Sequence, residues 1–220
     1  MSSRRLRRWK KTTQMQLDNR SARDKILAAA VQLFAEYGYH ASSMREIARI
    51  AGIQAASIYY HYPSKQALLV EIMQVHMRQL NANLERIVSK PHSFEQCFYD
   101  ALSNHIILHT TYKSEFFIID TEIRALQTEN REKILSLRDQ YEDLIQRLLR
   151  EGMEQGILSQ TDVKIASYAI IAMCTEVAQW FRPGGRLTVQ QVIEIYFQMI
   201  TRGLLSVKDR AETAEESAHI

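Results

Sequence analysis

Apolar residues recur every three or four positions through most of this 220-residue chain. In the first third they form four runs, which predict helices over residues 21–37, 43–51, 54–60 and 65–89. Ser21 precedes the first run and Ser43 the second, and an acidic residue follows each serine three positions later, as in a capping box. Gly38 and Gly52 follow these two runs, where glycine readily adopts the left-handed conformation that ends a helix.

The remaining two thirds of the chain have the same helical spacing. It predicts five more helices, over residues 94–112, 115–127, 130–155, 162–181 and 189–206. Alternation of apolar and polar residues with a period of two does not persist, so no strand is expected. The sequence therefore predicts an all-α fold, with an N-terminal three-helix domain followed by a larger helical domain.

The second and third predicted helices, separated by a turn at Gly52, have the arrangement of a helix-turn-helix. In that motif the second helix lies in the major groove of DNA and the first braces it. The stretch AASIYYH (residues 55–61) supplies small residues that allow close approach and tyrosine hydroxyls that can bond phosphates. The aromatic residues could instead hold the helices together. We expect that interior role for Phe34, Ile47, Ile58 and Tyr62, and DNA contact for Tyr59, Tyr60 and His61.

Charge is distributed unevenly along the chain. Through Lys65 there are 12 Lys and Arg against 4 Asp and Glu, whereas the remainder has 16 against 21. A basic front indicates a polyanionic partner, although a solvated charged surface gives the same pattern. Six cations lie in the stretch RRLRRWKK (residues 4–11), and we expect residues 1–20 to be a flexible basic arm. DNA contact is one interpretation of this arm, because such arms often follow phosphates or enter a minor groove. A solvated extension is the alternative.

Composition narrows the class of protein. No apolar run reaches the roughly 18 residues of a membrane span, and no apolar segment follows the basic N-terminus as in a secretory signal. We therefore expect a cytoplasmic protein with no membrane contact. Cys97 and Cys174 lie in apolar helical patterns and are predicted to be buried thiols. Gly-rich phosphate loops, GxSxG, HExxH and CxxC are absent from the sequence, so neither enzymatic activity nor a cofactor is predicted.

The segment from Ser21 to Leu69 resembles the N-terminal domain of the tetracycline-repressor (TetR) family of transcription regulators. Three motifs carry the resemblance: FAEYGY (34–39), IARIAGI (47–53) and YYHYPSKQALL (59–69). The resemblance implies double-stranded operator DNA as a partner, with DNA-contacting positions at Ser43, Arg45, Ala55, Ser57, Tyr59, Tyr60, His61 and Lys65. We expect Lys25 to join them. Relatives often carry a longer side chain at Ala55 and glycine at Ala56, so we expect few direct base contacts, with thymine methyl groups as one possibility.

The same resemblance implies the role of the C-terminal helices. They are expected to form a pocket for a small hydrophobic effector, and the last two long helices are expected to pair with a second subunit in a homodimer. Helices 162–181 and 189–206 are more apolar than one small domain needs, which suits a self-complementary interface. Core packing within one subunit is the alternative.

The stretch AQWFRPGGRLT (residues 178–188) resembles the segment before the final helix in TetR regulators that respond to acyl-CoA thioesters, including regulators of fatty-acid and steroid-ring breakdown. Arg182 and Arg186 flank a Pro-Gly-Gly turn and can bind phosphates, and Trp180 can stack on a ring or line an acyl tunnel. A tight turn with solvated arginines is the alternative.

Three further residues, His105, His109 and Phe116, are expected to line the effector pocket. The two histidines are four residues apart on a predicted helix, and with Asp120 and Glu176 they could hold a metal. Because nothing in the spacing requires a metal, we prefer a core or pocket role for the histidines and predict no metal site.

The sequence thus predicts a basic arm (1–20), a helix-turn-helix domain (21–66), an effector and dimerisation domain (67–207) and a disordered tail (208–220). The expected function is that of a repressor released from its operator by a hydrophobic molecule, with an acyl-CoA of lipid, steroid or aromatic-acid breakdown as the candidate. The effector is expected to tilt the helix that begins near Lys65 and so change the spacing of the two recognition helices.

Three alternatives remain open at the level of the sequence. One is an architectural DNA-binding protein without an effector, and another is an efflux regulator that senses lipophilic compounds. The third is a small-molecule-binding or enzymatic helical protein whose helix-turn-helix is only structural.

Overall fold

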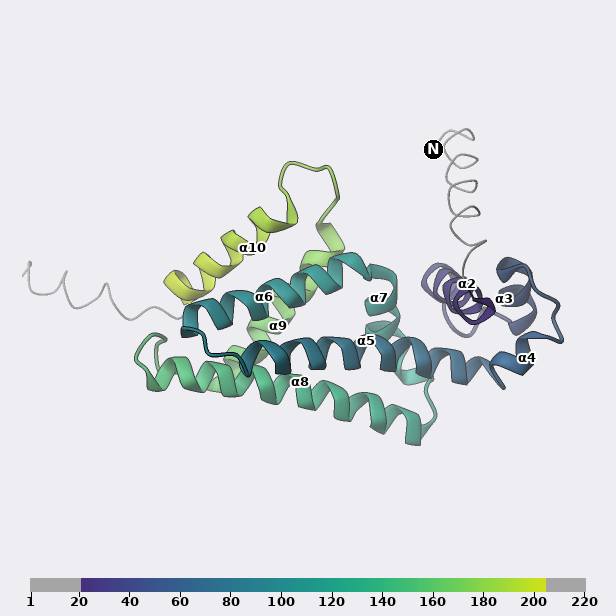
Figure 1. Cartoon of the computed structure of the whole chain (residues 1–220), viewed down its shortest axis with the longest axis horizontal. Helices are drawn as coiled ribbons and strands as arrows, with labels where there is room; N and C mark the ends of the chain where they lie inside the picture. The colour runs from purple at the N-terminus through teal and green to yellow at the C-terminus, as the bar shows by residue number, and fades with distance from the viewer. Residues whose placement is uncertain (1–20, 205–220) are drawn as a thin grey trace, which may run out of the picture. The chain divides into compact units, whose positions relative to one another are not determined.

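The structure is a computed structural model that describes residues 21–204, and all regular elements in that range are helical (Figure 1). The α-helices are α2 (Ala22–Tyr37), α3 (Met44–Ala51), α4 (Ile58–His61), α5 (Lys65–Val88), α6 (Phe94–Thr111), α7 (Lys113–Thr121), α8 (Thr128–Glu154), α9 (Val163–Trp180) and α10 (Val189–Gln198). A 3₁₀ helix, η1 (Ile123–Ala125), and a π-helical segment, η2 (Met199–Leu204), complete the fold. The predicted all-α class is confirmed. The predicted basic arm (1–20) and most of the C-terminal end, including the tail (208–220), lie outside the described residues.

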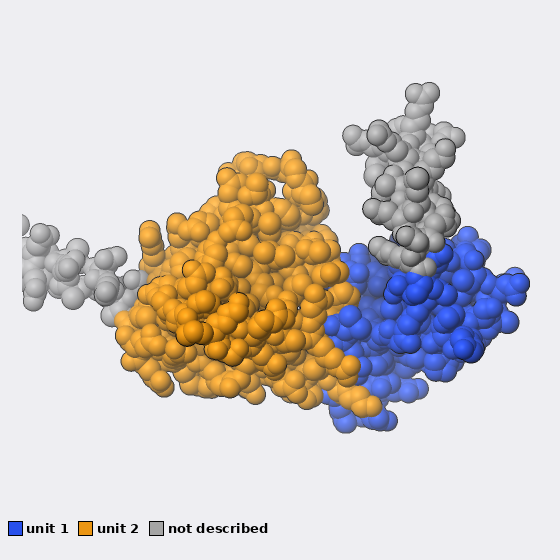
Figure 2. Space-filling model, viewed as in Figure 1, with its two compact units in different colours: residues 1–75, 114–132 blue, residues 76–113, 133–220 orange. Residues whose placement is uncertain are grey.

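The chain divides into two compact units, coloured separately in Figure 2. Among the described residues, the first comprises residues 21–75 and Ser114–Glu132, and the second comprises His76–Lys113 and residues 133–204. Helix α5 therefore contributes its first part to one unit and its second part to the other. The first unit also takes in a segment from the middle of the chain, around α7 and η1.

Short-range signals explain why α2 and α3 form where they do. The Oγ of Ser21 accepts a hydrogen bond from the Asp24 backbone N–H at 3.2 Å, and Ser43 and Glu46 form a complete capping box. Gly52, with a φ of 70°, ends α3 in the left-handed conformation. These caps satisfy backbone groups that the helix ends leave unpaired.

Helices α2 and α3 pack together and bury the residues assigned to the interior. Phe34, Ile47, Ile58 and Tyr62 are each at most 2% exposed. The predicted interior role of these four side chains is confirmed.

In the second unit, α6 packs against α9 and α10 around an aromatic cluster. The Phe98 ring is fully buried, stacks on Phe94 with centroids 5.6 Å apart, and lies 6.2 Å from the Phe197 ring. A Cβ at Gly152 on α8 would lie 2.5 Å from the Phe94 ring, so this close approach requires glycine.

The two cysteines belong to this unit and are buried free thiols, as predicted. Burial raises the pKa of the Cys174 thiol to about 12, and it also raises the pKa of Cys97. Both thiols are therefore protonated and poorly nucleophilic at neutral pH.

The recognition helix is shorter than the sequence predicted. The expected helix over 54–60 is α4, with only four residues, and residues 55–57 form a turn in which the Ser57 N–H donates to the Gln54 carbonyl at 3.0 Å. Ala55, Ala56 and Ser57 are exposed and bury no apolar face that would stabilise further helical turns.

The helix expected over 115–127 is also divided. It forms α7 and η1, with the break at Glu122, whose carboxylate accepts a hydrogen bond from the Tyr39 backbone N–H at 3.0 Å. The final helix likewise changes its pitch, from α10 to the π-helical η2, where the Thr201 hydroxyl donates to the Phe197 carbonyl at 2.7 Å. The Thr201 bond is local and competes with regular helical bonding, whereas the Glu122 bond reaches a residue 83 positions away.

Candidate DNA-binding surface and effector site

Helix α4 and the turn that precedes it carry a group of exposed polar and aromatic side chains. Tyr59 is 56% exposed and Tyr60 is 90% exposed. The His61 ring is partly exposed and lies edge-on to the Tyr60 ring, with centroids 5.3 Å apart. Arg45, Ala55 and Ser57 are exposed on the same helix-turn-helix. Since tyrosine, serine and arginine side chains commonly bond phosphate oxygens, this surface has the chemistry to contact DNA.

Two other residues are expected to contact DNA: Ser43, whose hydroxyl already has bonding partners, and Lys25, which is partly exposed. The Ser43 hydroxyl accepts from the Glu46 N–H at 3.2 Å and donates to the Glu46 carboxylate at 2.7 Å, which lowers the pKa of Glu46. Lys25 is partly exposed in the first turn of α2. The contact of either residue with DNA stays a prediction.

Lys65 has a structural role that the sequence did not indicate. Its Nζ donates to the carbonyl oxygens of Tyr39 at 2.6 Å and Ser42 at 2.7 Å, and it lies 4.2 Å from the centroid of the Tyr39 ring. Burial lowers the pKa of this ammonium group, while the charge of Glu122 opposes that shift. Lys65 therefore ties the start of α5 to the loop between α2 and α3, and one of its three N–H donors remains for a phosphate.

A second tether in the first unit was missed by the sequence reasoning. The Gln66 Nε2 donates to the Tyr39 hydroxyl and to the Ala125 carbonyl, both at 3.1 Å, and its Oε1 accepts from the Gln127 N–H at 3.0 Å. Together with the bond from Tyr39 to Glu122, these contacts join α5 to the segment around η1. Gln66 and its partners near η1 lie about 60 residues apart in the chain, so no local pattern announces these contacts.

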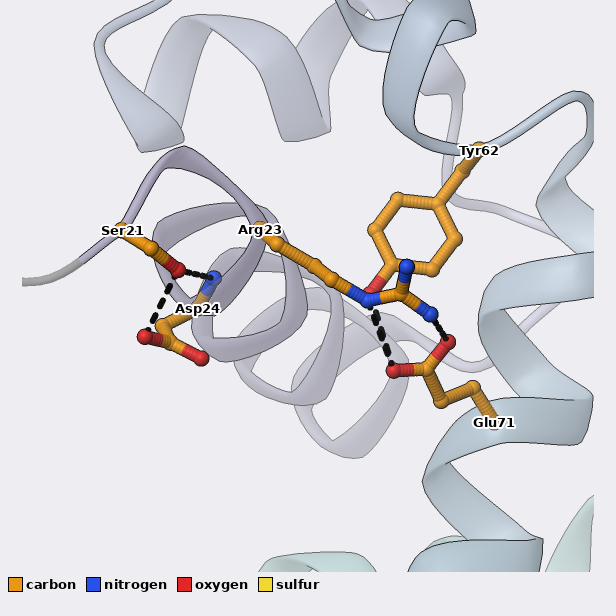
Figure 3. Close-up of polar contacts among 5 residues, drawn as sticks. All are labelled: Ser21, Arg23, Asp24, Tyr62 and Glu71. Atoms are coloured by element: carbon orange, nitrogen blue, oxygen red, sulfur yellow. Dashed lines mark hydrogen bonds and ion pairs between the residues drawn. The ribbon is translucent and has the colours of Figure 1, made fainter.

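Arg23, Tyr62 and Glu71 form a third group of polar contacts in the first unit (Figure 3). The Arg23 guanidinium forms a two-pronged ion pair with Glu71, with its Nε 3.2 Å from Oε1 and its Nη2 paired with Oε2. The Tyr62 hydroxyl donates to the same Oε1 at 3.1 Å, and the guanidinium carbon lies 5.0 Å from the Tyr62 ring centroid. One carboxylate thus joins α2, the residue that follows α4, and α5.

In the second unit, two of the predicted effector residues lie together in the core. His105 and His109 are 4% and 5% exposed, and their rings stack with centroids 4.0 Å apart. The nitrogens of His105 face hydroxyls, with Nδ1 2.8 Å from Tyr141 Oη and Nε2 3.0 Å from Thr175 Oγ1. The His109 Nδ1–H donates to the His105 carbonyl at 2.9 Å.

Burial controls the charge of this histidine pair. It lowers the pKa of His109 to about 4 and holds the pKa of His105 well below its ordinary value, with the neighbouring His109 adding to the second effect. Both rings are therefore neutral at pH 7. Burial likewise raises the pKa of Tyr141, which keeps its hydroxyl protonated. The group forms a neutral, hydrogen-bonded polar cluster inside a mainly apolar core.

The other predicted effector residues lie elsewhere. Phe116 is buried on α7, in the first unit, whereas the two histidines belong to the second. Trp180 is 49% exposed at the end of α9, with its ring 6.5 Å from the Tyr196 ring. Arg182 and Arg186 are exposed on either side of the Pro-Gly-Gly turn.

Arg182 has a cationic neighbour that the sequence reasoning missed. Its Nη1 donates to the Gln179 carbonyl at 2.9 Å, and the Lys113 Nζ donates to the same oxygen at 3.2 Å. Burial and the charge of Arg182 lower the pKa of Lys113. Two cations therefore meet at the C-terminus of α9, where the helix dipole favours positive charge.

Other features of the described residues indicate no further site. A surface groove of about 420 Å³ is lined by Glu85, Gln140, Asp143, Leu144, Arg147 and Arg150, and includes none of the predicted effector residues. Within residues 21–204, no three His, Cys, Asp or Glu side chains are arranged to hold a metal ion. None of the helices in this range is both long and apolar enough to cross a membrane.

Comparisons with known proteins agree with this arrangement. The family model "Bacterial regulatory proteins, tetR family" matches residues 26–72, and "Tetracyclin repressor-like, C-terminal domain" matches residues 91–204. The HTH-type transcriptional repressor KstR2 of Mycobacterium tuberculosis (strain ATCC 25618 / H37Rv) is 31% identical over 193 residues, covering 84% of this chain and 93% of the relative.

Two solved structures are also similar. The TetR family regulator PfmR from Thermus thermophilus has a TM-score of 0.74 and 32% identity, over 81% of this chain and 98% of that one. AibR, solved in complex with isovaleryl coenzyme A and operator DNA, has a TM-score of 0.74 and 26% identity, over 82% of this chain and 98% of that one. The helix-turn-helix, the C-terminal helical unit and these matches together lead to one conclusion. The chain belongs to the TetR family of DNA-binding transcriptional regulators, which are transcription factors and not enzymes.

Proposed function

We propose that this protein is a cytoplasmic repressor that binds operator DNA as a homodimer and releases it when an acyl-CoA thioester binds the second unit. Family membership carries the DNA-binding part of the proposal. The pairing of Lys113 and Arg182 on one carbonyl oxygen is the observation that carries the effector part.

The proposed DNA contacts lie on the helix-turn-helix and at its edges. They are Lys25, Ser43, Arg45, Ala55, Ser57, Tyr59, Tyr60, His61 and Lys65. The exposure of Tyr59 and Tyr60 supports this choice, because their hydroxyl groups are open to bond phosphate oxygens. Mostly small and uncharged side chains on the recognition turn favour phosphate contacts and thymine methyl groups over an extended set of base hydrogen bonds.

The proposed homodimer uses α9 and α10. Each helix leaves large apolar side chains exposed in the single chain: Ile165 and Tyr168 on α9, Ile195 on α10, and Met199 directly after it. A second copy of the same surface would bury these side chains in a self-complementary interface. Pairing would also provide two recognition helices, which a palindromic operator requires.

An acyl-CoA effector suits the chemistry at the end of α9. Coenzyme A carries phosphate groups, and two cations that share one carbonyl gain from an anion that bonds both. Lys113 and Arg182 form such a pair, and Arg186 lies four residues beyond Arg182. AibR supports this class of effector, because that relative was solved with isovaleryl coenzyme A. Stabilisation by the helix dipole alone is the competing explanation of the pair.

The acyl group would be recognised by the less polar residues. Trp180, two residues before Arg182, offers a flat apolar surface. Phe116 is buried on α7 in the first unit and is left out of the proposed site. His105 and His109 are held neutral, so neither places a charge beside an acyl chain.

Effector binding and operator binding are coupled by thermodynamic linkage. If the effector weakens operator binding, operator DNA must weaken effector binding by the same factor. The operator requires the recognition helices to be about one DNA turn (~34 Å) apart, so a small change in spacing weakens both half-sites. We propose α5 as the connecting element, because it begins beside the recognition helix and continues into the second unit.

The test is fluorescence anisotropy on DNA from immediately upstream of the protein's own gene. The protein–DNA complex is titrated with free CoA and with acyl-CoA thioesters of short, long and ring-containing acyl groups. We expect competitor-resistant binding that one class of thioester reverses and free CoA does not. If that fragment gives no specific binding, selection from genomic fragments replaces it before the readings are taken.

Arg182→Gln is the variant that examines the phosphate contact. Loss of one charge-assisted hydrogen bond should raise the thioester concentration needed for half-release about tenfold, without changing operator affinity. Arg78→Gln, at an exposed position on α5, is the matched control and should behave as the wild type. Release by lipophilic compounds that lack CoA, with no response to any thioester, would reject the acyl-CoA proposal and favour an efflux regulator.

A further inference from the structure

The recognition helix α4 is too short to fix its own orientation. Helix α4 has four residues, and its last backbone bond runs from the Tyr62 N–H to the Ile58 carbonyl at 2.9 Å. A single helical turn is unstable by itself, because several dihedral angles must be fixed for each bond gained. The direction of α4 must therefore come from the side chains that anchor it.

Two buried side chains supply that anchor, at opposite ends of α4. Ile58 is fully buried and Tyr62 is 2% exposed, whereas the intervening Tyr59 and Tyr60 face solvent. The Ile58 side chain has no polar atoms, so its contacts are non-directional and fix the orientation of α4 only loosely. Tyr62 also has directed polar contacts, and those contacts fix the position of its ring.

The directed contacts of Tyr62 all involve Arg23 and Glu71 (Figure 3). The Tyr62 hydroxyl donates to Glu71 on α5, while the Arg23 guanidinium from α2 pairs with Glu71 and lies near the Tyr62 ring. Burial and the charge of Glu71 raise the pKa of Tyr62, so its hydroxyl stays a donor at neutral pH. Three elements of the first unit thus meet at one carboxylate.

The charges of this group are informative about its role. A glutamate in a DNA-binding unit repels phosphates, so Glu71 on its own should weaken binding. Asp24 and Glu46, two other acidic residues of this unit, have a structural role, because each takes part in a helix N-terminal cap. Arg23, which would otherwise be taken for a phosphate contact, directs its guanidinium at Glu71.

We propose that Arg23, Tyr62 and Glu71 form a positioning clamp that sets the direction in which α4 presents Tyr59, Tyr60 and His61 to operator DNA. None of the three clamp residues needs to contact DNA. The inference rests on the proposed operator binding and adds the residues that orient the recognition helix.

Glu71→Gln gives the sharpest test, because the clamp and simple electrostatics predict opposite signs. Removal of a negative charge should tighten DNA binding if only charge matters. The clamp predicts that operator affinity instead falls about threefold to tenfold, as expected for residues coupled in one hydrogen-bonded network, while affinity for unrelated DNA does not fall. Glu85→Gln, on the same helix, removes the same charge and should not weaken operator binding.

Arg23 separates a clamp residue from a phosphate contact. In the clamp, Arg23→Gln lowers operator affinity by about as much as Glu71→Gln, and the double variant loses little more. The charge-exchanged variant R23E/E71R should regain part of the lost affinity. A phosphate contact predicts instead that Arg23→Gln weakens binding to all DNA and lowers the slope of log affinity against log salt by about one.

The measurement is anisotropy on operator and unrelated DNA over a salt series, with thermal unfolding of each variant as a check of folding. Tyr62→Phe keeps the buried ring, removes only the hydroxyl, and should give a smaller loss in the same direction. Wild-type protein that selects no specific DNA would defeat the proposed function. Wild-type protein that binds its operator, with Glu71→Gln binding as tightly as Glu85→Gln, would overturn the clamp alone.

Discussion

Each unit contains a polar group that joins its helices, and the two groups differ in charge and burial. In the first unit, the bonds between elements involve charged or partly exposed side chains such as Arg23, Lys65 and Glu71. In the second unit, a comparable group is buried and neutral, with His105 bonded to Tyr141 and Thr175. Both groups join helices, but only the first retains its charge.

The difference follows from the surroundings of each group, because the first lies near solvent in the DNA-binding unit and the second lies in the core. A surface for DNA benefits from retained positive charge, and near solvent a broken polar bond is partly replaced by water. In the interior, a polar group without a partner loses its hydration as well, so each bond of the histidine cluster contributes more to stability. Polar substitutions in the first unit should therefore lower operator affinity with little effect on the free energy of unfolding. Polar substitutions in the second unit should lower the free energy of unfolding with little effect on operator affinity.

The largest expected contrast is with pH, through His109. Its pKa is about 4 in the folded chain and 6.5 ordinarily, so between these values the unfolded chain binds the proton and the folded chain does not. His109 therefore contributes about 3 kcal/mol to the free energy of unfolding above pH 6.5, and this contribution is lost as the pH falls through 4. Urea unfolding of the wild type and His109→Gln at pH 7 and pH 4.5 measures it. An equal pH dependence in the two proteins would contradict the depressed pKa.

A matched pair of tyrosine substitutions gives the next largest contrast. Tyr141→Phe leaves His105 Nδ1 without its partner in the core and should lower the free energy of unfolding by about 1–3 kcal/mol. Tyr62→Phe leaves Glu71 bonded to Arg23 and near solvent, so its loss should be below about 1 kcal/mol. Chemical denaturation of both variants tests the contrast. A larger loss for Tyr62→Phe would reverse the comparison between the units.

The smallest expected effects distinguish two lysines of the first unit. Lys65→Met removes a donor to two carbonyl oxygens and should lower the free energy of unfolding by about 1 kcal/mol. If its remaining N–H bonds a phosphate, the salt slope of operator binding also falls by about one. Lys25→Met should lower the slope without affecting stability. Equal stability of the two variants would show that the Lys65 tether contributes little.

Some of the first unit could be predicted from the sequence because its signals are short-range. The capping pair Ser43 and Glu46, the left-handed Gly52 and the buried Phe34 all follow from spacing within a few residues. The length of α4 could not be predicted in this way. Residues 55–57 have acceptable helix propensity, but they bury no apolar face that would support a longer helix.

The candidate effector site was less accessible to prediction. His105 and His109 could be singled out by their spacing. Their burial, their neutral charge and the bond of His105 to Tyr141, 36 residues away, depend on how α6 and α8 pack. Lys113 was not singled out, because only the folded chain brings it to the same carbonyl oxygen as Arg182.

By itself, the sequence determined the helical class, the helix-turn-helix with its caps and turn, and the family. Helical periodicity and capping act within one or two turns, so a linear pattern records them. The tertiary structure alone decided which polar groups meet: Arg23 with Glu71, Lys65 with Tyr39, and His105 with Tyr141. Such pairs join residues 26 to 48 positions apart, and their bonds and pKa values depend on packing and burial that no local pattern encodes.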